Sequence, residues 1–300
     1  MKTTPTRKQT RFLRTTTAAL AAVFFALACG ETAAPRTTKD DLDRDVALPP
    51  RIERIVTLTP NVTEMIFAIG AGAKIVGTDD FSDFPEAARK LAKVGGMQPN
   101  IERIAALRPD VVIASTEGNH PNLVPALSAA RIPLFVVRTD RLAEVAVAMR
   151  RLGQILGAPQ ADAAASRLNA AVLGQRRMRT TPPRVLFAVW TDPLYVGGRG
   201  TFTDDLIEIT GALNAVQVTG WPQYSLEALV ASPPDLLLYP RGAVTPEQVR
   251  ALQQRVPEMK AQIVEVDENI FQRPGPRVVE AARRLNDILD AWERGSSNKR

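Results

Sequence analysis

The sequence has few of the residues on which most enzyme active sites depend. It contains one histidine, His120, and one cysteine, Cys29, among 300 residues. A zinc site of several histidines and a relay of histidines are therefore excluded, and no intramolecular disulfide can form. The sequence also lacks a Gly-x-Ser-x-Gly nucleophile elbow and a Gly-x-x-x-x-Gly-Lys-Ser/Thr phosphate loop. We therefore expect a protein that is not an enzyme and that has no cofactor or metal of its own.

Two isolated features could still belong to a site. Asp79, Asp80 and Asp83 share one loop after a predicted strand. Acidic residues in a loop without a supporting histidine more often form turns and helix caps than a metal site. His120 lies in Gly-Asn-His-Pro, which is typical of an exposed loop, and whether it contacts a ligand stays open.

The excess of positive charge is confined to the N-terminus. The formal net charge is +6, but residues 1–28 hold five basic residues and no acidic one. The remaining chain carries 33 basic and 32 acidic residues, from totals of 38 and 32. This balance does not provide the basic face with which proteins bind nucleic acid, so no nucleic-acid partner is expected.

Residues 1–28 have the pattern of a signal peptide. A basic segment precedes eleven apolar residues, Ala18 to Ala28, which is short for a membrane-spanning helix. Cys29 follows the small-residue cleavage site and resembles the lipidated cysteine of a bacterial lipobox, although Ala26 stands where Leu is usual. We expect an exported protein of the periplasm or cell surface, anchored in the membrane by lipid on Cys29, with a flexible tether over 29–50. An ordinary cleavage that leaves a free thiol is the alternative.

Parts of the sequence occur twice in the same order. Residues 100–113 resemble residues 225–238 at an offset of 125, and residues 148–156 resemble residues 281–289. A looser third pair begins at Thr63 and Thr203. Such internal repetition predicts two lobes of one design, with a cleft and an approximate two-fold axis between them.

Short apolar segments alternate with helical segments in both halves, which predicts parallel sheets covered by helices. The expected fold is therefore α/β, with two similar Rossmann-like lobes at 51–158 and 184–292. A single helix over 159–180 should join them, because this segment is rich in alanine and has no internal proline. A helical connector predicts a stiff receptor, and we expect a monomer. Residues 293–300 are expected to form a polar tail.

Five motifs resemble the periplasmic binding proteins of the iron-siderophore and cobalamin class. They are Arg54-Ile-Val-x-Leu-x-Pro60, Phe81-Ser-Asp-Phe-Pro85, the 100–113 segment, Trp221-Pro-Gln-x-Ser225 and Arg273-Pro-Gly-Pro-Arg277. The resemblance covers about residues 51–290 and is strongest to the cobalamin-binding branch. It implies a class III binding protein that holds a small molecule between its lobes. It also implies delivery to an ABC importer, made of a permease dimer and its ATPase subunits.

The resemblance also implies the functional residues. The ligand-binding positions would be Phe81, Phe84, Tyr195, Trp221, Asn269 and Arg273. Cobalamin or a related corrinoid is the expected ligand, and a ferric siderophore or, less well, haem is the alternative. A siderophore would need cationic groups, for which Arg138, Arg199, Arg241 and Arg273 are candidates. All three tryptophans lie in the second half, so the cleft should be less aromatic on the first lobe.

Glu102 and Glu227 occupy equivalent places in the two repeats, near the start of a helix. The resemblance implies that they dock the two lobes onto the two permease subunits. A carboxylate in the first turn also stabilises a helix by itself, which is the alternative explanation. A surface lipoprotein hydrolase is the alternative of a different functional class.

Overall fold

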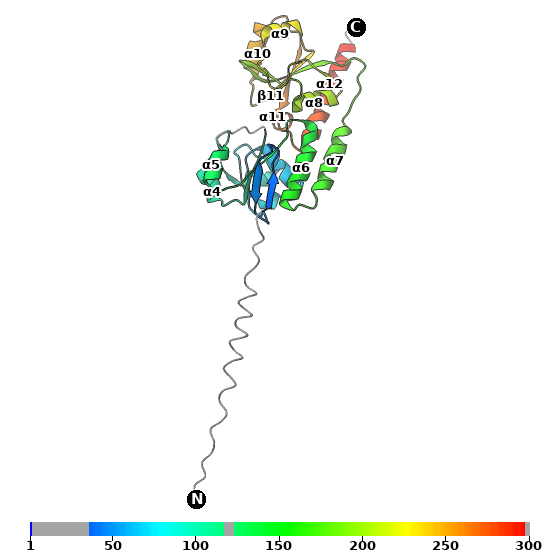
Figure 1. The fold of residues 1–300 in the computed structure, drawn as a ribbon. Coiled ribbons are helices and arrows are strands. Elements are labelled where there is room, and N and C mark those ends of the chain that lie inside the picture. The colour runs from blue at the N-terminus through cyan, green and yellow to red at the C-terminus, as the bar shows by residue number, and fades with distance from the viewer. Residues whose placement is uncertain (2–35, 117–122, 298–300) are drawn as a thin grey trace.

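The computed structural model describes residues 36–116 and 123–297, together with Met1. Two α/β lobes are stacked on each other, and helices α6 and α7 run along one side of the molecule (Figure 1). The predicted signal peptide, Cys29 and His120 lie outside the described residues. The predicted fold class, two similar lobes with parallel sheets, is confirmed.

The N-terminal lobe is built on a parallel sheet in the order β5-β4-β3-β6-β7. Its central strands are apolar and buried on both faces, as expected for a sheet covered by helices. The elements are β3 (Ile55–Thr57), α2 (Pro60–Ala68), η1 (Gly72–Lys74), β4 (Ile75–Thr78), α3 (Glu86–Arg89), β5 (Ala92–Lys93), α4 (Ile101–Ala106), β6 (Val111–Ser115), α5 (Leu123–Ala129), β7 (Leu134–Val137) and α6 (Leu142–Leu156).

The C-terminal lobe repeats this arrangement. Its sheet has the order β10-β8-β11-β12, with the short β9 added antiparallel to β8. The repeated segments of the sequence form equivalent elements, since α4 with β6 corresponds to α9 with β11. The elements are β8 (Arg184–Thr191), β9 (Leu194–Val196), α8 (Phe202–Ile209), β10 (Leu213–Asn214), α9 (Leu226–Ala231), β11 (Leu236–Arg241), α10 (Pro246–Arg255), β12 (Gln262–Asp267), α11 (Glu268–Phe271) and α12 (Val278–Ser297).

The connecting helix is shorter than expected. Helix α7 covers Ala161–Leu173, which is 13 residues or about 20 Å, against the expected 159–180. Residues 174–176 still donate to carbonyls of α7, but the Asn286 side chain donates to the Gln175 carbonyl and the Arg177 N–H donates to the Ile209 carbonyl, so the chain then bonds to the C-terminal lobe. The buried Arg179 then pairs with Asp290 at 2.8 Å and Glu293 at 3.0 Å. These bonds fix the connector on the second lobe.

The expected flexible tether over 29–50 is wrong for its second half. Residues from 36 onward form an antiparallel hairpin of β1 (Arg36–Lys39) and β2 (Asp45–Leu48). The Asp40 carboxylate accepts the backbone N–H groups of Leu42 and Arg44 at 3.0 Å and so closes the turn. At the tip of the hairpin, Asp41 accepts the Arg138 N–H at 2.7 Å. Polarity alone suggested a tether because these tertiary partners lie about a hundred residues away.

The C-terminal end also differs from expectation. Helix α12 continues to Ser297, so the predicted polar tail at 293–300 begins as the last turn of a helix. This helix buries Ala281, Ala282, Leu285 and Leu289 against the core that both lobes share. Among the described residues, no helix is both long and apolar enough to cross a membrane.

Candidate functional site

The site lies where the carboxyl ends of the two parallel sheets face each other. Ligands of open α/β sheets bind beyond the carboxyl ends of the strands, so this junction is the candidate site. Loops that follow β4 and β7 in the first lobe contact residues of α8 and of the segment before α12 in the second lobe. Two groups of ion pairs bridge the lobes, and we call them the Glu64 clamp and the Asp205 clamp.

The Glu64 clamp joins α2 to the segment that precedes α12. Arg277 donates to both carboxylate oxygens of Glu64, at 2.9 and 2.6 Å. Arg273 lies 3.5 Å from the same carboxylate and 2.6 Å from Asp83. The Glu64 side chain is only 2% exposed. Burial alone would lower the pKa of Arg277, but the hydrogen bonds to Glu64 and the negative charges of Glu64, Asp83 and Asp267 together outweigh this effect and raise it. Arg277 is therefore held as a cation between the lobes.

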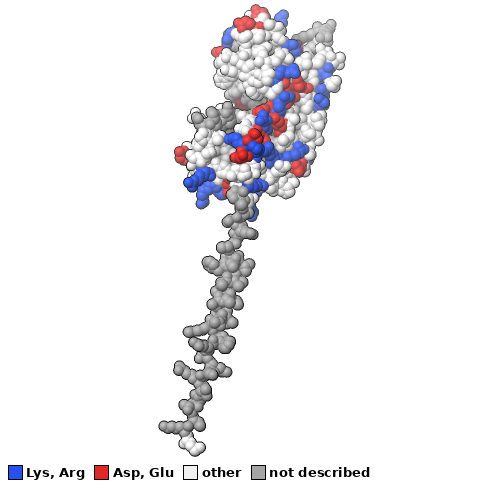
Figure 2. Space-filling model, viewed as in Figure 1, with Lys and Arg blue, Asp and Glu red and all other residues white. Residues whose placement is uncertain are grey.

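The Asp205 clamp joins α8 to the start of α6. The Asp205 carboxylate accepts two hydrogen bonds from the Arg141 guanidinium and a third from the Leu142 N–H at 2.8 Å. A carboxylate of the second lobe thus caps a helix of the first lobe, where the positive end of the helix dipole stabilises it. The hydrogen bonds that Arg141 donates to Asp205 also raise the pKa of Arg141. Figure 2 shows acidic and basic side chains that alternate across the junction on this side of the molecule.

Four of the predicted ligand-binding residues are large aromatics that the protein leaves uncovered. The exposed fractions are 52% for Phe81, 45% for Phe84, 38% for Tyr195 and 49% for Trp221. Phe81 and Phe84 follow β4 in the first lobe, and Tyr195 and Trp221 come from the second lobe. Exposed aromatic side chains beside a lobe junction are typical of a binding site that buries them when occupied.

The loop that carries Phe81 is built around Asp79. One Asp79 oxygen accepts the Phe81 N–H at 2.9 Å and the other accepts the Ser82 hydroxyl. Burial raises the pKa of Asp79, and these hydrogen bonds only partly oppose the effect. The Phe81 ring covers Gly96, where an added Cβ would lie 3.0 Å from it. Asp79 therefore has a structural role in the loop, and Asp83 binds Arg273. The described residues contain no group of acidic, His or Cys side chains arranged to hold a metal ion.

The aromatic residues of the second lobe lie on one short β-structure. Tyr195 on β9 is bridged to Gln223, two residues from Trp221. The Trp221 ring lies against Gly197, where a Cβ would come 3.3 Å from Cζ3. The sequence reading missed Trp190, which is opposite Tyr195 in the β8–β9 register and is 42% exposed. Its position at the end of an apolar strand was the available signal.

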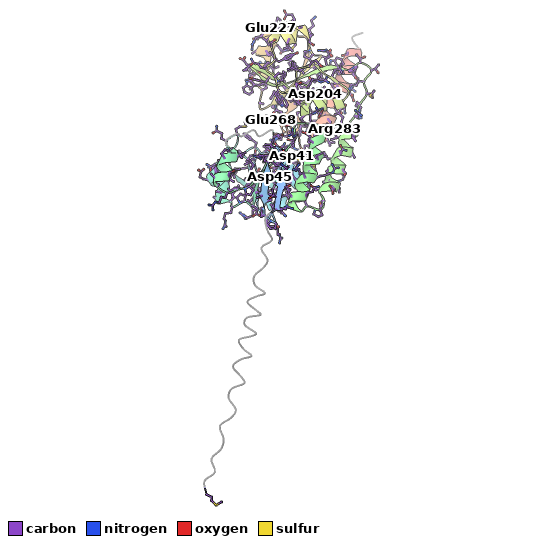
Figure 3. The ribbon with its side chains drawn as sticks, in the orientation of Figure 1. Asp41, Asp45, Asp204, Glu227, Glu268 and Arg283 are labelled. Atoms are coloured by element: carbon purple, nitrogen blue, oxygen red, sulfur yellow. The ribbon has the colours of Figure 1, made fainter. Side chains whose placement is uncertain are left out.

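The two polar residues predicted to bind the ligand, Arg273 and Asn269, already form hydrogen bonds with other residues of the chain. Arg273 donates to Asp83 and to the Phe81 carbonyl at 3.2 Å, so it is engaged across the junction. Asn269 is half-buried on α11, and its carbonyl accepts from Arg277 at 3.0 Å. Its neighbour Glu268 lies close to the junction in Figure 3. Both residues therefore lie near the junction, and Arg273 also fixes the loop that carries Phe81.

Glu102 and Glu227 are exposed in the first turns of α4 and α9. Each helix has a side-chain cap at its start, because the Asn100 side chain accepts the Arg103 N–H and the Ser225 hydroxyl accepts the Ala228 N–H. Hydrogen bonds from its own backbone N–H and from Ser225 lower the pKa of Glu227. Figure 3 shows Glu227 at the outer end of the C-terminal lobe. Neither glutamate forms an ion pair within the described residues.

Comparison with known proteins identifies this architecture. The model of the family described as periplasmic binding protein matches residues 55–283. The chain belongs to this family. The match includes both sheets, the connecting helix and both clamps. It places the protein among the extracytoplasmic binding components of transport systems.

Individual relatives differ in what their names say they bind. The vitamin B12-binding protein of Yersinia pestis (strain Pestoides F) is 31% identical over 239 residues, which are 78% of this chain and 85% of that protein. The periplasmic haem-binding protein RhuT from Roseiflexus sp. RS-1 is 29% identical with a TM-score of 0.70, over 80% of this chain and 98% of that one. The vitamin B12-binding protein BtuF of Vibrio cholerae has a TM-score of 0.67 and 24% identity, over 81% and 98%. This last likeness shows the fold.

The Asp83–Arg273 bridge should make the junction sensitive to acid. Burial raises the pKa of Asp83, but the hydrogen bond from Arg273 and the positive charges of Arg273 and Arg277 together outweigh burial and bring the pKa below the ordinary value of 3.8. Its contribution to stability is thus present above pH 3.8 and is lost as the pH falls through the lower folded value. We expect Asp83→Asn to reduce stability at neutral pH and to flatten the acid side of the stability curve.

The measurement is the free energy of unfolding in denaturant from neutral pH down to strong acid. Asp80→Asn is the matched control, since Asp80 lies in the same loop and, among the described residues, its side chain accepts one hydrogen bond, from the Gly95 N–H at 3.3 Å. The raised pKa of Asp79 has the opposite effect on stability as the pH falls, and this effect is the same in all variants. Parallel pH curves for the wild type and Asp83→Asn would show that the bridge contributes nothing.

Proposed function

We propose that the protein is the extracytoplasmic binding component of an ABC importer and that it carries cobalamin or a related corrinoid. The 31% identity to a vitamin B12-binding protein over 78% of the chain is the observation that carries this proposal. The uncovered aromatics of both lobes agree with it, because a corrin ring is large and mostly apolar. The corrinoid is the transported ligand, and the protein binds it without catalysing a reaction.

The surroundings of the candidate arginines favour a corrinoid over a ferric siderophore. An anionic chelate needs cationic groups that are free to meet it. Arg273 already binds Asp83, and Arg241 lies 3.5 Å from Glu265. Arg199 lies 3.7 Å from Glu208, and Arg138 donates to the Asp41 carbonyl at 2.8 Å. Recruiting any of them for a siderophore would break an interaction of the protein.

Haem is the second candidate, because the structural relative RhuT is named as haem-binding at 29% identity. Haem usually takes an axial ligand from the protein. Tyr195 is an exposed phenol of the second lobe, and His120 lies outside the described residues. Titration of the purified protein with cobalamin, haem and ferric siderophores decides among the three. Tight binding of haem with an axial-ligand spectrum, and none of cobalamin, would replace the corrinoid proposal.

Trp221 should contribute directly to corrinoid affinity. We expect Trp221→Ala to weaken cobalamin binding by about 1–3 kcal/mol, because a stacked aromatic surface is lost. Calorimetry is the suitable measurement, since the substitution also removes a fluorophore. Trp292→Phe is the control, because Trp292 packs on α12 against the core. Equal cobalamin affinities of wild type and Trp221→Ala would show that Trp221 is not part of the binding site.

We also propose that Glu102 and Glu227 dock the receptor onto a permease dimer. Each lobe presents one unpaired carboxylate at an equivalent place, which suits a partner with two-fold symmetry. The double variant Glu102→Arg with Glu227→Arg should keep its ligand affinity and lose uptake through the cognate importer. The control is Glu86→Arg with Glu247→Arg, which changes a first-turn glutamate on each lobe elsewhere. Normal uptake by the first double variant would leave only the helix-capping role.

Lipid on Cys29 is proposed as the anchor, since an unpaired exposed thiol is unfavourable in an oxidising compartment. Cys29→Ser should release the mature protein from membranes. The intact mass of the native protein is the measurement, and full retention requires more than one acyl chain. An unmodified mature N-terminus by mass would exclude the anchor.

A further inference from the structure

The basic residues of the N-terminal lobe gather at the end of that lobe that faces away from the second lobe. Each of its five parallel strands is preceded, within three residues, by a lysine or arginine. Because the strands are parallel, these positions meet at one end of the sheet, which we call the base. They are Arg54, Lys74, Lys90, Arg108 and Arg131. Figure 2 shows blue side chains at this lower end of the molecule.

Few acidic side chains balance the base. Glu53 is already engaged by Arg51 at 2.6 Å and by Lys74 at 3.6 Å. The Asp110 carboxylate accepts the backbone N–H groups of Glu53 and Arg54. Within the described residues, the side chains of Lys90, Arg108 and Arg131 are exposed and form no hydrogen bond or ion pair. These three cations are free to meet an external anionic surface.

The fold itself does not require this pattern. Cations near the ends of helices are stabilised by the helix dipole, and Lys90, Arg108 and Arg131 each follow a helix. The C-terminal lobe has the same succession of helices and parallel strands, so cations at its helix ends would be stabilised in the same way. There, only two of the four parallel strands have a basic residue at this end, Arg184 as the first residue of β8 and Lys260 before β12, against all five strands of the N-terminal lobe. The architecture alone therefore does not account for the number of basic residues at the base.

The described chain begins at this same base. The Arg36 side chain donates to the Ile155 carbonyl at the end of α6, and Lys74 donates to the next carbonyl, of Leu156, at 2.9 Å. The β1–β2 hairpin holds the chain there through its bonds to β7 and α6. Only six residues separate Cys29 from Arg36, and the seven steps from one Cα atom to the next can span at most about 25 Å. An anchor at Cys29 would thus keep the base close to its own bilayer.

From these observations we infer that the base of the N-terminal lobe is a contact surface for anionic lipid headgroups. Several cations close to an anionic bilayer attract it, and the attraction adds to that of an acyl anchor. The contact belongs to the receptor before it docks, because it directs the C-terminal lobe with Glu227 away from the bilayer, and the receptor leaves it when Glu102 and Glu227 both meet the permease. The argument from tether length rests on the proposed lipidation of Cys29, whereas the charge argument is independent of it.

The test uses the mature chain with Cys29→Ser, so that no acyl chain contributes. Binding is measured by flotation with phosphatidylcholine vesicles and with vesicles that contain one third phosphatidylglycerol, at low and at high salt. We expect binding only to the anionic vesicles, and weaker binding at high salt. The base variant carries Lys90→Gln, Arg108→Gln and Arg131→Gln. Each lost charge should weaken binding roughly fivefold, or about a hundredfold in total.

The matched control carries Arg176→Gln, Lys260→Gln and Arg283→Gln, which remove the same charge from exposed positions outside the base. Cobalamin or haem titration and circular dichroism verify that both variants are folded. Retained vesicle binding by the control and loss by the base variant would support the inference. Equal loss in both variants would show a net-charge effect, and no binding of the wild type to anionic vesicles would overturn the inference. Either result leaves the corrinoid proposal and the mass test of Cys29 untouched.

Discussion

The buried carboxylate of Glu64 is the point on which the arrangement of the two lobes depends. It comes from the first helix of one lobe and is almost fully enclosed by arginines from the other lobe. A buried charge is tolerated only when it is paired and hydrogen-bonded, and removal of one partner typically costs about 3–5 kcal/mol. The lobes therefore cannot separate at this place without exposing or stranding a charge. This electrostatic requirement acts together with the apolar core that both lobes share.

The same interaction extends to the candidate binding residues. Arg273 lies beside Glu64 and also binds Asp83 and the Phe81 carbonyl. The Arg277 guanidinium lies 4.5 Å from the centre of the Phe84 ring. The aromatic loop of the first lobe is consequently positioned by cations of the second lobe. A ligand that meets Phe81 and Phe84 finds their backbone already fixed, which reduces the entropy lost on binding. The stiffness expected from a helical connector is thus reinforced at the site itself.

The sequence predicted the features that repeat and missed those that depend on distant partners. The duplicated segments identified α4 with β6 and α9 with β11, because caps and apolar periodicity are local. The hairpin at 36–48 was not foreseen, since it is held by Arg138 and Arg151 from far along the chain. The connector was predicted too long for the same reason, as Asn286 and Ile209 end its helical bonding. The resemblance placed Arg273 in the ligand site, but it could not show that the Asp83 carboxylate lies beside this arginine.

The two clamps are related by the internal symmetry but differ in strength, and this difference determines how the junction can move. In each clamp an acid of the first helix of one lobe binds an arginine that directly precedes the last helix of the other. Glu64 is buried and bound by two arginines, whereas Asp205 meets one arginine whose side chain is 45% exposed. Solvent screens the exposed pair and reduces its contribution. We therefore expect small rotations of the lobes to stretch the Asp205 clamp beside α6 before the Glu64 clamp at the aromatic loop.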